Sequence, residues 1–250
     1  MSYLNETEGN GSFVIKVFPD VESVAQAAAQ IFVEKFKAAM TRSERFSVVL
    51  SGGKTPLRTY ELLAKEPFTS QVNWRQVNVF FGDERCVPIT DRRSNYKMAD
   101  ETLLSHVPIP ARQIHSIPFD NEPQKAAVEY ENILREYFGE KPPIFDLVFL
   151  GLGNDGHTAS LFPNSTSLNE KVRWTTSLKN SGEDFSRITL TPQILNRTKM
   201  AIFLVTGQDK AEILDKVLAE GDPPEILPAR LIHPIKGKLV WLVDSAAGIL

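Results

Sequence analysis

The feature of this sequence that most constrains its fold is the alternation of short apolar segments with longer amphipathic ones. Apolar segments of strand length occupy residues 13–18, 46–50, 77–84, 145–153, 187–190, 200–206 and 238–244. Apolar residues at helical spacing occupy residues 21–40, 56–64, 95–105, 128–139 and 208–220. Strands without clean alternation, interleaved with helices, indicate a parallel sheet that is covered on both faces. We therefore expect a three-layer α/β/α fold, built as a single domain over residues 1–250.

The overall charge argues against a polyanionic partner. The chain has 28 Lys and Arg against 31 Asp and Glu, a formal net charge of -3, so neither nucleic acid nor an anionic membrane is expected as a partner. The first residues lack the order of a signal peptide, and no apolar run reaches the roughly 18–20 residues that span a bilayer. Cys86 is the single cysteine, which excludes an internal disulfide. We expect a cytoplasmic protein, and we expect it to be a monomer.

The turns that follow the apolar segments are the places to search for a site. In a mainly parallel sheet, ligands bind beyond the carboxyl ends of the strands. Polar or glycine-rich sequences stand there at four positions: SGGKTP (51–56), GDERCVP (82–88), GLGNDGHTASLFP (151–163) and TGQDK (206–210). If the sheet forms as expected, these four turns lie at one edge.

The sequence SGGKTP matches the end of a nucleotide-binding P-loop motif, but the turn is too short to form a P-loop. That motif requires an earlier glycine, and Val48 stands in its place. Gly52 and Gly53 still permit a tight turn with exposed amides. Thr55 is expected to cap a helix that begins at Pro56. The free amides at the N-terminus of such a helix can bind one phosphate group. The turn therefore predicts a site for a single phosphate, with a plain strand-to-helix turn as the alternative.

The turn GLGNDG matches the glycine pattern of a dinucleotide site, but its surroundings do not fit one. In a dinucleotide site the glycine-rich turn is followed by a long helix, whereas here a proline, Pro163, stands only seven residues after Gly156. The same turn holds His157, whose polar flanks include Asn154 and Asp155. Histidine titrates near neutrality and is the commonest general base. His157 is thus the candidate catalytic residue, and the other three histidines are expected to be structural or exposed.

The remaining turns supply charged side chains. Asp83 and Arg85 follow an apolar strand. The Asp83 carboxylate can orient a histidine and the Arg85 guanidinium can bind an anion. The alternative is that both residues belong to a solvated loop. Lys210, at the expected start of a helix, can pair with a phosphate. Cys86 beside Arg85 is expected to be a packed thiol and not a nucleophile. The scattered histidines and single cysteine fit no metal motif, so no metal and no cofactor are expected.

Taken together and in this order, these segments resemble the 6-phosphogluconolactonase family. The matching pieces are LSGGKTP, FFGDERCVP with SNYKMADETLL, FDLVFLGLGNDGHTASLFP, RITLT and VTGQDKAEIL, with GKLVWLVD extending the match. The stretch HTASLFP favours this family over the related glucosamine-6-phosphate deaminases, which carry a different sequence after their histidine. The resemblance implies the Rossmann-like sheet shared with those deaminases, ribose-5-phosphate isomerase and CoA-transferase-like proteins.

The resemblance also implies a reaction, the hydrolysis of 6-phospho-D-glucono-1,5-lactone to 6-phosphogluconate in the oxidative pentose phosphate pathway. His157 would activate a water molecule, with Asp83 or Asp155 orienting its ring, and Arg85 or the amides of residues 153–156 would bind the oxyanion. The substrate would be held by Gly52, Gly53, Lys54, Thr55, Asn154, Arg187 and Lys210. Lys54 and the pair Gln208-Asp209 depart from the usual family residues: Lys54 adds a positive charge, which is compatible with a phosphate, and Asp209 adds a negative charge beside Lys210.

Two other functions remain open at this point. The first is a phosphosugar isomerase or deaminase on the same fold. The second is a non-catalytic phosphosugar-sensing domain of a transcriptional regulator, which we expect less because only about 12 residues precede the first expected strand and no DNA-binding segment is found among them.

Overall fold

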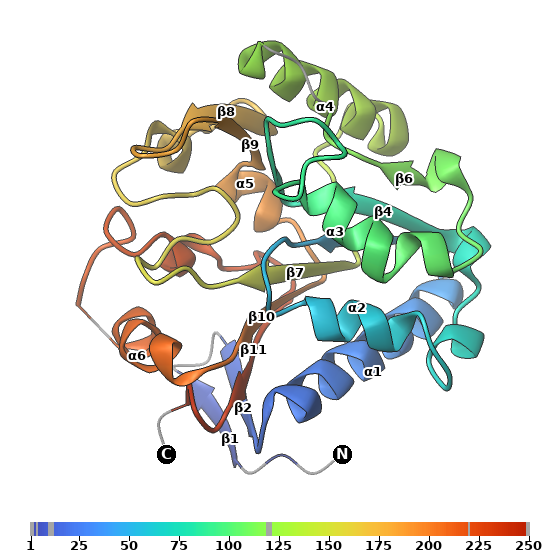
Figure 1. The fold of residues 1–250 in the computed structure, drawn as a ribbon, viewed down its shortest axis with the longest axis horizontal. Coiled ribbons are helices and arrows are strands. Elements are labelled where there is room, and N and C mark those ends of the chain that lie inside the picture. The colour runs from blue at the N-terminus through green and yellow to red at the C-terminus, as the bar shows by residue number, and fades with distance from the viewer. Residues whose placement is uncertain (1–2, 4, 10–12, 119–121, 220, 249–250) are drawn as a thin grey trace.

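A sheet of eight strands in the order β1-β2-β11-β10-β7-β3-β4-β6 forms the centre of the described chain (Figure 1). The computed structural model describes residues 3, 5–9, 13–118, 122–219 and 221–248. The strands are β1 Asn5–Gly9, β2 Phe13–Phe18, β3 Phe46–Leu50, β4 Val77–Phe81, β6 Ile114–His115, β7 Leu147–Gly151, β10 Met200–Val205 and β11 Lys238–Asp244. Only β1 runs antiparallel to its neighbour. The expected mainly parallel sheet is confirmed.

Helices cover both faces of this sheet, which confirms the three-layer arrangement. They are α1 Val21–Met40, α2 Leu57–Leu63, α3 Asn95–Thr102, α4 Pro123–Phe138, α5 Pro192–Leu195 and α6 Ala211–Leu218. On β4, Phe80 contacts Tyr137 of α4 and the next residue, Phe81, contacts Tyr96 of α3. Because successive side chains on a strand point to opposite faces, α3 and α4 lie on opposite sides. Figure 1 likewise shows α1 and α2 on one side and α6 on the other.

The central strands are buried on both faces, as a covered parallel sheet requires. All five residues of β3 and of β4 are buried, and burial of their apolar side chains is the main driving force for the layers to associate. Helix α1 turns its small and apolar residues toward the sheet, and its start is fixed by Asp20, whose side chain accepts a hydrogen bond from the Ser23 amide at 2.7 Å.

A second, smaller sheet differs from the sequence-based prediction. The apolar run 77–84 predicts one strand, but the chain divides at Gly82 into β4 and a short strand, β5 Asp83–Arg85. Strand β5 pairs antiparallel with β9 Ser186–Leu190, which pairs in turn with β8 Thr175–Lys179. The segment 187–190 therefore belongs to this three-stranded sheet, because β5 leaves the main sheet and offers it an edge. It brings Arg85 and Arg187 opposite each other.

No helix in the described part of the chain combines the length and the apolar composition needed to cross a membrane.

Candidate active site

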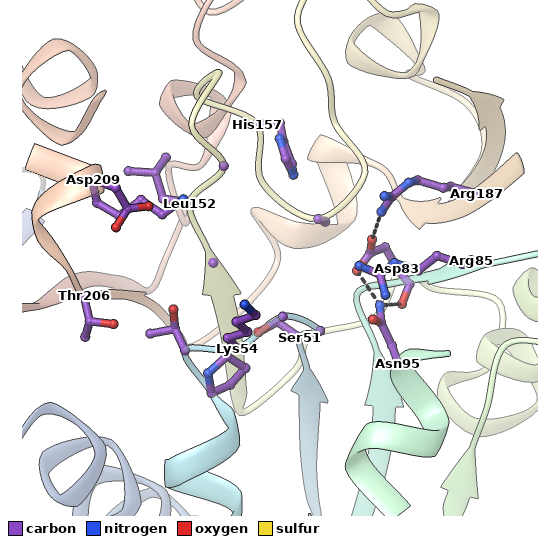
Figure 2. Close-up of a pocket in the computed structure, with 18 of the residues that line it drawn as sticks. Ser51, Lys54, Asp83, Arg85, Asn95, Leu152, His157, Arg187, Thr206 and Asp209 are labelled. Carbon is purple, nitrogen blue, oxygen red and sulfur yellow. Dashed lines mark hydrogen bonds and ion pairs between the residues drawn. The ribbon is translucent and has the colours of Figure 1, made fainter. Parts of the chain in front are cut away.

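All four polar turns meet in one cavity of about 510 Å³ beyond the carboxyl ends of the main-sheet strands (Figure 2). Its lining contains residues 51–56 after β3, Asp83 and Arg85 after β4, residues 151–153 with His157 after β7, and Thr206, Asp209 and Lys210 after β10. The lining is completed by Asn95 of α3, Arg187 of β9, Val21 of α1 and Ala159. Parallel strands end at the same edge, so the fold brings together turns that are far apart in the sequence.

His157 is held in place by its own turn. Its Nδ1 atom lies 2.5 Å from Asp155 Oδ1, and its backbone amide donates to the same oxygen at 3.1 Å. The Gly153 amide donates to the His157 carbonyl at 2.8 Å, and the ring packs against Phe162 with centroids 4.4 Å apart. Figure 2 shows the ring directed into the cavity. With Nδ1–H donated to the carboxylate, Nε2 is the ring atom that can accept a proton.

Asp155 supports this ring from outside the cavity lining. Burial acts to raise the pKa of Asp155, but the hydrogen bond and the charge of His157 outweigh burial, so the pKa is lowered. The carboxylate therefore stays ionised at neutral pH and can stabilise a protonated histidine. The sequence left open whether Asp83 or Asp155 contacts the ring; the carboxylate that accepts the hydrogen bond of the ring is that of Asp155.

Asp83 takes part in a different, buried network. Its carboxylate accepts a hydrogen bond from Ser160 Oγ at 2.6 Å and one from Asn95 Nδ2 at 3.1 Å, and it lies 3.6 Å from Arg187 Nη1. Figure 2 shows Asn95 and Arg187 converging on it. Asp83 is 5% exposed, so its partners are needed to offset the cost of burying a charge. We infer that Asp83 orders this wall of the cavity.

Asn95 is a site residue that the sequence analysis missed. A Cβ atom at Gly52 would lie 1.9 Å from Asn95 Oδ1, so the turn after β3 and the start of α3 touch without space for a side chain. Glu84 fixes the start of α3, since its carboxylate accepts from the Asn95 amide at 2.7 Å and from the Tyr96 amide at 2.8 Å. The sequence feature that could have pointed to Asn95 is the residue before it, Ser94, which is a typical helix cap. Its side chain caps α3 by accepting a hydrogen bond from the Lys97 amide.

The two arginines of the cavity differ in how far their charges are compensated. Arg187 binds Glu183 through two hydrogen bonds of 2.7 and 2.5 Å and also faces Asp83. The side chain of Arg85 donates only to a carbonyl, that of Arg93 at 2.5 Å, and forms no ion pair with any residue that the structure describes. Arg85 is therefore the guanidinium whose charge remains available to an anion in the cavity.

The turn after β3 contains the left-handed glycine expected of a tight turn, but not the expected helix cap. Gly53 has φ of 95°, a left-handed conformation that favours glycine. Thr55 does not cap the helix: α2 begins at Leu57, its cap residue is Pro56, and no side chain bonds there. Pro56 itself adopts a helical conformation, φ -75° and ψ -14°, so the turn enters the helix without an extended cap residue.

Lys210 and Lys54 bring positive charge to this part of the cavity. Lys210 Nζ donates a hydrogen bond to Asn154 Oδ1, so Asn154, which is not part of the lining, acts on the site through Lys210. Lys54 is exposed and lines the cavity. Asp209 also lines it and partly offsets the two lysines.

Cys86 is a poor nucleophile in this environment. Burial, followed by the nearby charge of Glu84, raises the pKa of the Cys86 thiol to about 11. We expect iodoacetamide to label Cys86 at pH 7.5 more slowly than free glutathione, with a rate that keeps rising as the pH approaches 11, because only the thiolate reacts. Mass spectrometry of the labelled protein measures this rate, and labelling faster than glutathione would contradict the assignment.

No group of residues suited to a metal ion is found in the described ranges. The remaining three histidines lie elsewhere: His106 and His233 are exposed, and His115 stacks on Phe80 with centroids 4.4 Å apart.

Comparison with known proteins identifies the family that this chain matches. Residues 19–241 match the model of a family described as glucosamine-6-phosphate isomerases/6-phosphogluconolactonase. A 6-phosphogluconolactonase of Nostoc sp. is 37% identical over 238 residues, 94% of this chain and 96% of that protein. The crystal structure of 6-phosphogluconolactonase from Thermotoga maritima has a TM-score of 0.80 at 31% identity, covering 92% of this chain and 99% of that one. A monomeric glucosamine-6-phosphate deaminase, at 20% identity and a TM-score of 0.79 over 93% and 98% of the two chains, shares the fold.

Proposed function

The chain belongs to the family of glucosamine-6-phosphate isomerases and 6-phosphogluconolactonases, and we propose that it hydrolyses 6-phospho-D-glucono-1,5-lactone with His157 as general base. Its relatives at 35–37% identity over most of the chain are 6-phosphogluconolactonases, which supports lactone hydrolysis in the oxidative pentose phosphate pathway. The observation that carries the mechanism is the 2.5 Å hydrogen bond between His157 Nδ1 and Asp155 in a cavity lined by cations.

The proposed step uses the histidine first as a base and then as an acid. His157 Nε2 takes a proton from a water molecule while the water oxygen forms a bond to C1 of the lactone. The carbonyl oxygen becomes an oxyanion, and its collapse breaks the bond between C1 and the ring oxygen. The protonated histidine, stabilised by Asp155, then gives its proton to that leaving oxygen, which becomes the C5 hydroxyl of the product.

Arg85 is the group best suited to stabilise the oxyanion. The sequence also offered the amides of residues 153–156, but the Gly153 amide bonds the His157 carbonyl and the Gly156 amide bonds the Gly153 carbonyl. These two donors are occupied, whereas Arg85 forms no ion pair with a carboxylate of the described residues. A preorganised donor of this kind lowers the barrier where negative charge develops.

The phosphate of the substrate would lie on the turn after β3, with Lys54 and Lys210 as its cations. Gly52, Gly53 and Thr55 supply the turn, and Asn154 holds Lys210. Arg187, which the sequence placed in this clamp, is already compensated by Glu183 and Asp83, so we assign it to ordering Asp83. Fixing the distant phosphate places the lactone ring against His157.

Replacing Lys210 with alanine is expected to raise KM by about tenfold with little change in kcat. A charge-assisted hydrogen bond to the phosphate exists equally in the ground state and the transition state, so its loss weakens binding alone. Initial-rate kinetics measure the effect. Lys216→Ala is the matched control, because Lys216 lies on α6 and pairs with Glu212 outside the cavity. A fall in kcat at constant KM would contradict the assignment of Lys210.

A substrate panel tests the proposed function against its alternatives. The purified protein is given freshly made 6-phosphogluconolactone, glucosamine 6-phosphate and ribose 5-phosphate in parallel. We expect faster loss of the lactone than its spontaneous opening, no ammonia from the amino sugar and no ketose from the pentose phosphate. Ammonia or ketose release would favour the isomerase or deaminase function, and binding without any turnover would favour the sensing domain. We further propose that the enzyme acts as a cytoplasmic monomer without a nucleic-acid partner; the net charge of -3 supports the last of these points.

A further inference from the structure

Two buried tyrosines outside the cavity each bind the backbone at the end of a strand that leads into the site. The Tyr60 hydroxyl donates to the Ser51 carbonyl and accepts from the Ser51 amide, both at 3.0 Å. The Tyr130 hydroxyl makes the same pair of bonds to Phe81, both at 2.9 Å. Both tyrosine side chains are fully buried, with 0% exposure. Neither residue lines the cavity, so neither belongs to the proposed reaction steps.

Each hydroxyl stands where a neighbouring strand no longer pairs. Strand β7 is in register with β3 at Val48 and Val49, and Ser51 lies two residues beyond that pairing. Strand β6 ends at His115, opposite Phe80, so Phe81 has no partner residue on that side. A backbone amide and carbonyl that are buried without partners are costly. The tyrosine hydroxyls satisfy these groups in place of the missing strand.

The two tyrosines hold different halves of the site. Ser51 is followed directly by the turn of residues 52–55, which forms the proposed phosphate cradle. Phe81 is followed by Gly82 and then by Asp83 and Arg85, which form the wall opposite. We propose that Tyr60 and Tyr130 are positioning residues: Tyr60 fixes the phosphate cradle, and Tyr130 fixes the strand end that carries Asp83 and Arg85. This inference rests on the proposed function for its kinetic readout.

The variants Tyr60→Phe and Tyr130→Phe remove one oxygen atom each and leave the packing of the ring in place. For Tyr60→Phe we expect KM for the lactone and Kd for 6-phosphogluconate to rise about tenfold, with kcat within about twofold of wild type. For Tyr130→Phe we expect kcat to fall about tenfold at nearly constant KM, because Arg85 loses its position relative to the oxyanion.

Tyr137→Phe is the matched control. Tyr137 lies on α4 with Tyr130, and its buried hydroxyl has no hydrogen-bond partner in the part of the chain that the structure describes. We expect its kcat and KM to equal those of wild type. If both test variants lose thermal stability but keep wild-type kcat, KM and Kd, the tyrosines are only structural and the inference is overturned.

Two further measurements separate this inference from the proposed function. Calorimetric titration with 6-phosphogluconate measures binding without turnover. If wild type does not hydrolyse the lactone, the proposed function fails. Even then, weaker binding of 6-phosphogluconate by Tyr60→Phe than by wild type supports the part of the inference that concerns Tyr60. Absence of binding by wild type overturns both the proposed function and this inference.

Should a variant fail to fold, hydrogen exchange of the wild-type protein tests the inference instead, because the Ser51 and Phe81 amides must exchange as slowly as amides inside the strands. Fast exchange at either position overturns its half.

Discussion

Replacing His157 with glutamine is expected to lower kcat for lactone hydrolysis by about 10²–10⁴-fold and to leave KM nearly unchanged. Glutamine keeps a polar side chain of similar length but cannot take a proton from water. The phosphate cradle is untouched by the change, so the substrate still binds. Stopped-time assays corrected for spontaneous lactone opening measure the remaining rate.

The control for this substitution is His106→Gln. His106 is exposed, and its Nε2 atom lies 2.9 Å from the Glu101 carbonyl, away from the cavity. Its kcat should match that of wild type. A His157→Gln variant with wild-type kcat would remove His157 from the role of base.

Replacing Gly153 with alanine is expected to lower kcat by about 10²-fold, since a misplacement of about 1 Å at a reacting group has this effect. A Cβ atom at Gly153 would lie 2.1 Å from His157 Nδ1 and 2.2 Å from Cε1. The ring must turn away, and the hydrogen bond between Nδ1 and Asp155 is lost with it. Kinetic assays at saturating lactone measure the loss of kcat.

Gly82→Ala is the matched control for this steric argument. Gly82 also follows a main-sheet strand, but a Cβ atom there would meet its nearest neighbour, Val49 Cγ1, at 3.5 Å, an ordinary contact. We expect kcat close to that of wild type. Equal losses in the two variants would show that the Gly153 effect is not specific to His157.

The sequence predicted strands β2, β3, β4, β7, β10 and β11 of the main sheet, because most of their residues are apolar and buried and therefore read as unbroken apolar runs. It missed the edge strands, since β1 has a polar sequence and β6 is only two half-buried residues long. Because parallel strands place their carboxyl ends at one edge, the order of elements alone was enough to bring the four polar turns together. Strand β8 was missed because Thr175–Lys179 is mostly half-buried and polar, and β9 was assigned to the wrong sheet because its partner is a strand that departs at Gly82.

The site was predicted less completely than the fold, because side-chain partners depend on contacts distant in sequence. His157 and Asp155 are two residues apart, and their hydrogen bond follows from one turn. By contrast, Asn95 joins Asp83 and Gly52 through the packing of α3, and the charge of Arg187 is compensated by Glu183 at the tip of a hairpin. The cap assigned to Thr55 failed because Pro56 adopts a helical conformation before α2 begins.

The hydrolysis of 6-phosphogluconolactone by His157 is tested most directly by watching the lactone carbonyl itself. The lactone labelled with ¹³C at C1 is followed by NMR in three samples: buffer alone, wild type and His157→Gln. The lactone signal should give way to the carboxylate signal of 6-phosphogluconate many times faster with wild type than in buffer, and with His157→Gln at a rate close to that in buffer. Equal rates in buffer and with wild type would contradict the account.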